Sequence, residues 1–163
     1  MLASTVFFIL ERQNVSDKWK TSMTVAALVT GVAWYHYTYM RDHWVGTGDS
    51  PLVLRYVDWL ITVPLQVSEF YLILAAVGVA SAALFFRLFG ASIIMLVSGF
   101  IGESGIIGGN AWMWFVIGMV AWIYIIYEIW AGDAKNKVSE TSEGTQFAFK
   151  AMAFILTLSL IHI

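Results

Sequence analysis

The fold follows from one stretch, RYVDWLITVPLQVSEF, residues 55–70. Apolar residues dominate it, as in the middle of a membrane helix, yet it contains Arg55, Asp58, Gln66 and Glu69. Asp58 and Glu69 are 11 residues apart, so on a helix both lie on one face, about 16 Å apart along the axis. A carboxylate at the centre of a membrane helix costs about 2.5–3.5 kcal/mol on insertion scales. This face is therefore expected to point toward a protein interior or a wet cavity.

The composition around this stretch is that of a membrane protein. Of the 163 residues, 60% are hydrophobic and 12% are charged, and the mean hydropathy is +0.75. A soluble domain carries about 25% charged residues. The net charge of −2 and the absence of a basic run give no indication of nucleic acid as a partner. The chain has no cysteine, which excludes disulfides and thiolate sites, and its three histidines lack metal-ligand spacing.

Apolar segments alternate with short polar breaks, which predicts an all-α transmembrane bundle. The segment at 1–10 is too short for a full span, which needs about 20 residues. Further segments are predicted at 19–40, 52–76, 82–101 and 111–130, and a sixth, partial one begins near residue 147. The polar stretch GDAKNKVSETSEGTQ, residues 132–146, is expected to be a loop.

Basic residues predict the orientation of the chain. Seven Lys or Arg residues fall in the odd-numbered loops or beside them, against two near the second loop. The positive-inside rule then places the odd loops in the cytoplasm and the N-terminus outside. In this orientation Asp58 lies near the outer end of its helix and Glu69 lies toward the cytoplasm.

The two carboxyls are expected to differ in charge. Glu69 has no cation nearby in the sequence and is expected to hold a proton at rest, whereas Asp58 can pair with Arg55 one turn away. One ionised and one protonated carboxyl along one face would suit a proton relay. The alternative is that both are structural and pair with groups on other helices.

Other polar residues have two interpretations each. His36 lies at the same depth as Asp58 within a few Å and can hydrogen-bond to it, or it belongs to an interfacial aromatic belt, WYHYTY. Glu103 and Glu128, near helix ends, are expected to be interfacial. Trp59 is the best candidate for a pocket wall.

The stretch RYVDWLITVPLQVSEFYLILAA resembles the third helix of the proteorhodopsins, within the microbial rhodopsin family. The similarity extends through ERQNVSDKWKTSMTV, WYHYTYMRDHW, TGDSP, GFIGESGI and IYIIYEIWAGD, and covers Met1 to about Thr157. The resemblance implies a seven-helix bundle that binds all-trans retinal as a protonated Schiff base on a lysine. It also implies a light-driven outward proton pump, not an enzyme, in the bacterial plasma membrane, surrounded by lipid and forming a homo-oligomer.

The resemblance also implies residue roles. Asp58 matches the counterion and proton acceptor, His36 its partner, Arg55 the outer half-channel and Glu69 the proton donor. Gln66 matches the position where glutamine accompanies blue absorption and leucine green. Pocket-lining positions are matched by Trp59, Thr62, Met95, Gly99, Phe115 and Gly118.

Parts of the family pattern are not matched. No lysine follows Lys150, so a seventh helix with its lysine is expected to be missing, as are most of the sixth and the start of the first. The expected fold is an incomplete bundle with about five full helices. The last residues, LSLIHI at 158–163, resemble a translated adapter used in DNA library preparation and are expected to be non-native. The chain alone is expected to be inactive.

Two alternatives to a pump remain at this stage. One is a sensory rhodopsin, which Glu69 argues against because sensors usually lack a carboxylic donor there. The other is a retinal-free helical transporter or structural subunit, in which Arg55, Asp58 and Glu69 would form ordinary ion pairs.

Overall fold

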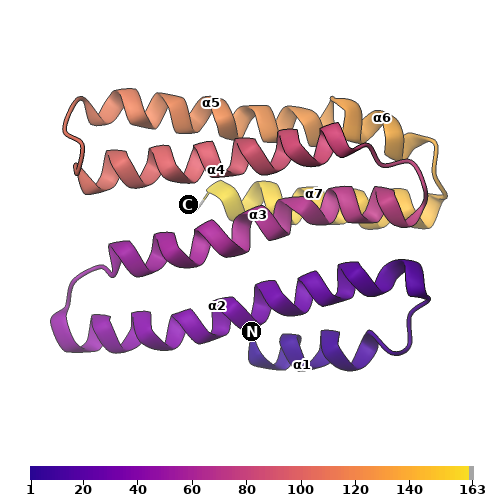
Figure 1. Cartoon of the computed structure of the whole chain (residues 1–163), viewed down its shortest axis with the longest axis horizontal. Coiled ribbons are helices and arrows are strands. Elements are labelled where there is room, and N and C mark those ends of the chain that lie inside the picture. Colours follow the sequence, from indigo (N-terminus) through magenta and orange to yellow (C-terminus); the bar gives the residue numbers. More distant parts are fainter. Residues whose placement is uncertain (162–163) are drawn as a thin grey trace.

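The computed structural model describes residues 1–161, and helices account for most of them. Figure 1 shows the long helices lying side by side, each antiparallel to the one before it. Consecutive helices pack as neighbours from α1 to α5, and α7 lies against α3 and α5. The elements, in chain order, are α1 (Leu2–Glu11), the 3₁₀ turn η1 (Asp17–Trp19), α2 (Lys20–Thr47), α3 (Leu52–Ala76), α4 (Ala82–Ser104), α5 (Ala111–Trp130), α6 (Asp133–Ser139) and α7 (Glu143–Ile161).

The all-α class predicted from the sequence is confirmed, and the bounds of α3 and α5 are those predicted. Within residues 1–161, five helices have 19 residues or more: α2 with 28, α3 with 25, α4 with 23, α5 with 20 and α7 with 19. The Leu52–Ala76, Ala82–Ser104 and Ala111–Ser139 segments are long and apolar enough to cross a bilayer. The Thr, Tyr and His residues of α2 lower its hydropathy, although its length suffices.

The structure corrects several predicted boundaries. The second helix continues to Thr47 instead of ending near residue 40, and the fourth continues to Ser104. The polar stretch 132–146 is not a loop throughout, because it contains α6 and the start of α7. Ala134 and Val138, four residues apart, are both buried, so the tertiary packing of one apolar face accounts for this short helix. The non-native tail at 158–163 stays a prediction, and its residues 162–163 lie outside the described residues.

The helix ends have the backbone and side-chain signals that their geometry requires. Gly48 and Gly105 follow α2 and α4 with φ of 74° and 64°, a left-handed conformation that favours glycine. Ser81 and Asn110 precede α4 and α5, and their side chains accept hydrogen bonds from amides of the first turn. These four residues produce the tight turns that bring α2, α3, α4 and α5 side by side.

The core is centred on α3. Phe70, Leu74 and Val67 of α3 are fully buried, as are Leu88 of α4 and Ile125 of α5. Lipid is as apolar as these side chains, so close packing and small residues at the contacts hold membrane helices together. The two carboxyls of α3 therefore lie in the most enclosed helix of the bundle.

Pro64 lies inside α3, between the two carboxyls. A proline has no amide to donate, so the carbonyl of Leu60, four residues earlier, has no partner within the helix. The Ser68 hydroxyl donates to the carbonyl of Pro64 at 2.6 Å. The helix continues through this turn with one backbone hydrogen bond fewer.

Candidate functional site

Asp58 is buried near the start of α3, with 2% of its surface exposed. Its Oδ1 lies 2.9 Å from Nδ1 of His36, which comes from α2. When Asp58 is ionised, this contact requires the proton of a neutral imidazole to lie on Nδ1, because a carboxylate can only accept. Thr62, one turn further along, donates its hydroxyl to the backbone carbonyl of Asp58 at 2.9 Å. Asp58 and His36 thus meet at the α2–α3 interface, at the depth that the sequence indicated.

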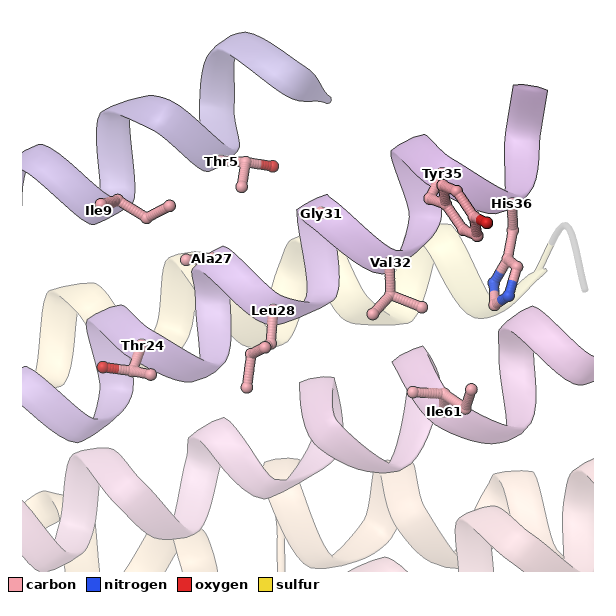
Figure 2. Close-up of a pocket in the computed structure, with 10 residues that line it drawn as sticks. All are labelled: Thr5, Ile9, Thr24, Ala27, Leu28, Gly31, Val32, Tyr35, His36 and Ile61. Atoms are coloured by element: carbon pink, nitrogen blue, oxygen red, sulfur yellow. The ribbon is translucent and has the colours of Figure 1, made fainter.

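His36 also borders an open apolar groove of about 640 Å³ between α1, α2 and α3. Figure 2 shows its imidazole pointing toward α3, near Ile61, while Thr5 and Ile9 form the opposite wall on α1. One side of the pair formed by His36 and Asp58 is therefore enclosed by helices, and the other adjoins this groove.

Arg55 pairs with Glu103 of α4, which corrects the expected pairing with Asp58. Tyr56 donates its hydroxyl to the other oxygen of Glu103 at 3.0 Å. The Arg55 guanidinium lies over the ring of Trp59, 5.3 Å from its centroid. Arg55 and Asp58 lie one turn apart on α3, but the longer arginine side chain reaches across to α4. Glu103, expected to be merely interfacial, is thus the partner of two residues of α3.

Glu69 is buried toward the other end of α3, with 7% of its surface exposed. Ser22 of α2 donates its hydroxyl to Oε2 of Glu69 at 2.5 Å. The other oxygen, Oε1, is buried and has no hydrogen-bond partner among the described residues. No cation of the described part of the chain forms an ion pair with Glu69. A carboxyl with one hydroxyl donor in apolar surroundings is far less costly when it is neutral than when it is charged.

The residues expected to line a chromophore are spread over three helices. Met95 is buried, and Trp59 packs against the same hydrophobic core. Gly99 lies under Tyr56, since an added Cβ would be 2.9 Å from the Tyr56 hydroxyl. Phe115 is more than half exposed at 54%. The remaining positions are the buried Thr62, the half-buried Gln66 and Gly118, which faces the Met95 carbonyl.

The fit of the chain to a retinal Schiff base depends on two features, the surroundings of Asp58 and the positions of the lysines. Asp58 is a buried carboxyl whose ion-pair partner is a histidine, so its environment suits an additional positive group. Four of the five lysines, Lys18, Lys20, Lys135 and Lys137, lie in polar segments of the chain, and the fifth, Lys150, is exposed within α7. Lys150 lines a small cavity with Lys135 and Val138, at the end of the bundle that holds Glu69. Among the described residues, the ion-pair partner of Asp58 is His36 and not a lysine.

Comparison with known proteins identifies the family. The model of the bacteriorhodopsin-like protein family matches residues 1–161. The chain belongs to this family. It is 54% identical over 156 residues to a green-light absorbing proteorhodopsin of Gamma-proteobacterium EBAC31A08, covering 96% of the chain and 62% of that protein. It is 52% identical over 158 residues to a blue-light absorbing proteorhodopsin of Gamma-proteobacterium Hot 75m4, with coverage of 97% and 62%.

A solved structure agrees with this assignment. The crystal structure of the blue light-absorbing proteorhodopsin from Med12 superposes with a TM-score of 0.80 at 51% identity, covering 98% of the chain and 70% of that protein. The proteorhodopsin resemblance of the sequence is thereby confirmed. The chain spans 62% of the length of these two curated relatives.

Sequence reasoning missed three contacts of the charged and polar residues. Ser22 had no distinguishing signal, because a serine on a membrane helix is common. Glu103 was visible as a charge at a helix end, but its partner lies on another helix. Glu128 was also expected to be interfacial, yet only 4% of its surface is exposed. Its periodicity gave a signal, since Ala121, Ile125 and Glu128 recur at the spacing of one helical face.

Proposed function

We propose that this chain is part of a retinal-binding, light-driven outward proton pump. The observation that carries the proposal is the pair of buried carboxyls on one face of α3, in a member of the bacteriorhodopsin-like family. Each carboxyl has one side-chain partner from α2, His36 for Asp58 and Ser22 for Glu69. Asp58 would be the counterion and proton acceptor, and Glu69 the donor that resupplies protons.

All-trans retinal, when bound, would supply the light-driven displacement of charge. The chain's own residues hold and move the proton. Asp58 would accept it, and His36 would share it through the contact between Nδ1 and Oδ1. Arg55, held by Glu103, would keep a positive charge in the outer half-channel without neutralising Asp58 directly. Glu69 would hold a proton at rest, because its environment offers one hydroxyl and no cation.

The binding region would be lined by the seven residues expected from the sequence. Gln66, half-buried on α3 between Asp58 and Glu69, would favour blue absorption, because a polar amide beside the polyene favours the ground-state charge distribution. Sequence identity does not discriminate between colours, since the green and blue relatives match almost equally well. The remaining lining residues are Trp59, Thr62, Met95, Gly99, Phe115 and Gly118.

The 163 residues by themselves are proposed to form no covalent pigment and to pump no protons. Lys150 lies on α7 and lines a cavity with Lys135 and Val138 of α6, which supports the proposal that it does not serve a counterion at Asp58. The protein would lie in a bacterial plasma membrane with its N-terminus outside, as a homo-oligomer surrounded by lipid. A covalent retinylidene adduct on this chain would contradict this part of the proposal.

The test uses a gene product that carries this chain and extends to the length of the curated relatives. Cells that express it with all-trans retinal should become coloured and should acidify the medium under light. Asp58→Asn should abolish acidification, and Glu69→Gln should slow proton uptake by roughly a hundredfold, within the range of a positioned proton donor. Asp49→Asn, at an exposed residue outside the helices, is the matched control and should leave the rates unchanged.

The outcomes separate the alternatives. A coloured protein that gives no acidification but a slow light response would indicate a sensor. A protein that stays colourless with retinal would indicate a retinal-free transporter or structural subunit. Acidification that is unaffected by Asp58→Asn would contradict the role proposed for Asp58.

A further inference from the structure

Glu128 is a buried carboxyl near the end of α5 that the proposed proton path does not use. Its Oε1 accepts from the Tyr124 hydroxyl at 2.9 Å and lies 3.3 Å from Nε of Arg87. Its Oε2 accepts from the backbone amide of Asp133 at 3.1 Å. A buried carboxylate is retained only when its hydrogen bonds and charge are compensated. These three contacts provide that compensation and join α4, α5 and α6.

Arg87 contacts both carboxylates of this group, Glu128 and Asp133. Its Nη2 lies 3.0 Å from Oδ2 of Asp133, the first residue of α6, while its Nε contacts Glu128. Gly132, just before α6, allows the close approach of this segment. A Cβ at this position would be 2.6 Å from Oε2 of Glu128 and 2.7 Å from its Cα. The backbone that enters α6 therefore lies directly against the carboxyl that binds it.

The helix held in this way covers the end of the bundle that contains Glu69. Ala134 and Val138 of α6 are buried in the same hydrophobic core as Phe70 and Leu74, which follow Glu69 on α3. In Figure 1, α6 lies at the end of the bundle where α3 ends and α2 begins. α6 has only seven residues, too few to be stable in isolation. Its position therefore depends on its buried face and on the contacts at its start.

We propose that Arg87, Glu128 and Asp133 form a latch that holds α6 over the Glu69 end of the bundle. Arg87 and Glu128 are then positioning residues for proton uptake, because release of α6 gives water access to the buried face around Glu69. The proton-uptake part rests on the proposed function, whereas the latch itself does not.

The latch is tested on this chain in nanodiscs, where both faces are open to a water-soluble maleimide. The chain has no cysteine, so Val138→Cys, at a residue only 3% exposed, introduces a single thiol that is labelled when α6 opens. Arg87→Gln should increase its labelling rate by about tenfold or more, corresponding to about 1.4 kcal/mol of local stability. Arg41→Gln is the matched control, because Arg41 is exposed and pairs with its own neighbour, Asp42.

A second perturbation avoids the charges. Gly132→Ala places a methyl group against Glu128 and should also increase the labelling of Val138→Cys. Gly144→Ala is its control, because a Cβ there meets nothing within 4 Å. Met40→Cys, at a buried residue of α2 near the opposite end, reports any general loosening of the bundle.

The latch is supported if labelling rises at Val138→Cys and not at Met40→Cys. Unchanged labelling in both Arg87→Gln and Gly132→Ala overturns it, and an equal rise at both reporter sites overturns it too. If Arg87→Gln does not fold, Gly132→Ala decides. Arg87→Lys should restore slow labelling in part, because it keeps the charge.

The link to proton uptake is tested in the longer, pigmented gene product. Arg87→Gln should change the rate of light-triggered proton uptake several-fold, while Arg41→Gln should not. An unchanged uptake rate overturns the positioning role. A product with no response to light contradicts the proposed function instead, and the labelling result still decides the latch.

Discussion

Gly99→Ala should lower the free energy of unfolding of the bundle, although a change from glycine to alanine inside a helix is usually stabilising. The added Cβ would be 2.9 Å from the Tyr56 hydroxyl and 3.5 Å from Cε1 of the same ring. The ring cannot easily move, because Tyr56 is only 5% exposed and its centroid lies 5.1 Å from that of Trp59 and 5.2 Å from that of Phe100. Any shift of the hydroxyl would also disturb its 3.0 Å hydrogen bond to Glu103.

The magnitude follows from two costs. Overpacking a well-filled interior costs about 1–3 kcal/mol, and a disturbed hydrogen bond to a charged group can add up to about 1.5–3 kcal/mol. Against these, alanine is favoured over glycine inside a helix by about 0.5–1 kcal/mol. We therefore expect a net loss of about 1–3 kcal/mol for Gly99→Ala. Gly90→Ala is the matched control on the same helix, because a Cβ there meets nothing within 4 Å, and it should be neutral or slightly stabilising.

The assay is reversible unfolding in mixed micelles by titration with SDS, followed by far-UV circular dichroism. Tyr56→Phe supplies the double-mutant cycle. Alone it should be destabilising, since it removes the bond to Glu103, but in the Gly99→Ala background its cost should fall by about 1 kcal/mol, because the crowded hydroxyl is gone. If Gly99→Ala is as stable as Gly90→Ala, or if the two substitutions are additive, the close approach of Gly99 to Tyr56 is refuted.

Three further predictions concern packing, capping and charge. Phe70→Ala, at a fully buried side chain, should cost about 3–5 kcal/mol in the same unfolding assay, whereas Phe86→Ala, at a residue 70% exposed, should change stability by less than about 1 kcal/mol. Asn110→Ala removes the side chain that caps α5 and should cost about 0.5–2 kcal/mol, and a wild-type midpoint would contradict the capping role. The hydrogen bond and charge of Lys20 lower the pKa of the exposed Asp17 from its ordinary value. The small stabilisation from Asp17 is therefore present above its unfolded pKa and is lost as the pH falls through the lowered value. Lys20→Gln should return the pKa of Asp17 toward normal in an NMR titration, and an unchanged pKa would refute this cause.

The sequence was sufficient to predict features that depend on periodicity. The 11-residue spacing placed Asp58 and Glu69 on one face of α3, and both are buried in the structure. Apolar segments separated by short polar breaks gave the limits of α3 and α5. Depth along two antiparallel helices allowed the contact between His36 and Asp58, but it left open the alternative of an interfacial aromatic belt, and the structure has the contact.

The sequence could not predict which of several nearby charged or polar groups a charged side chain contacts. Arg55 was one turn from Asp58, but it pairs with Glu103 because α4 packs against α3 at that height. The buried environment of Glu128 depends on Arg87, 41 positions earlier in the chain. These contacts depend on helix rotation and crossing, which the pattern of a single chain does not specify. α6 was missed for a related reason, since its burial comes from tertiary packing and not from its polar composition.

Pro64 makes α3 easier to bend at one turn than elsewhere along the helix. The turn that contains it has one backbone hydrogen bond fewer than its neighbours, so bending there requires less force than elsewhere along the helix. Asp58 and Glu69 lie on opposite sides of this joint and therefore belong to two segments that can tilt separately. A tilt of a few degrees would move one carboxyl relative to the packing of its own partner, His36 or Ser22, while the other stayed in place. Any bending of α3 would therefore change the distance between the two carboxyls more readily at Pro64 than elsewhere in the helix.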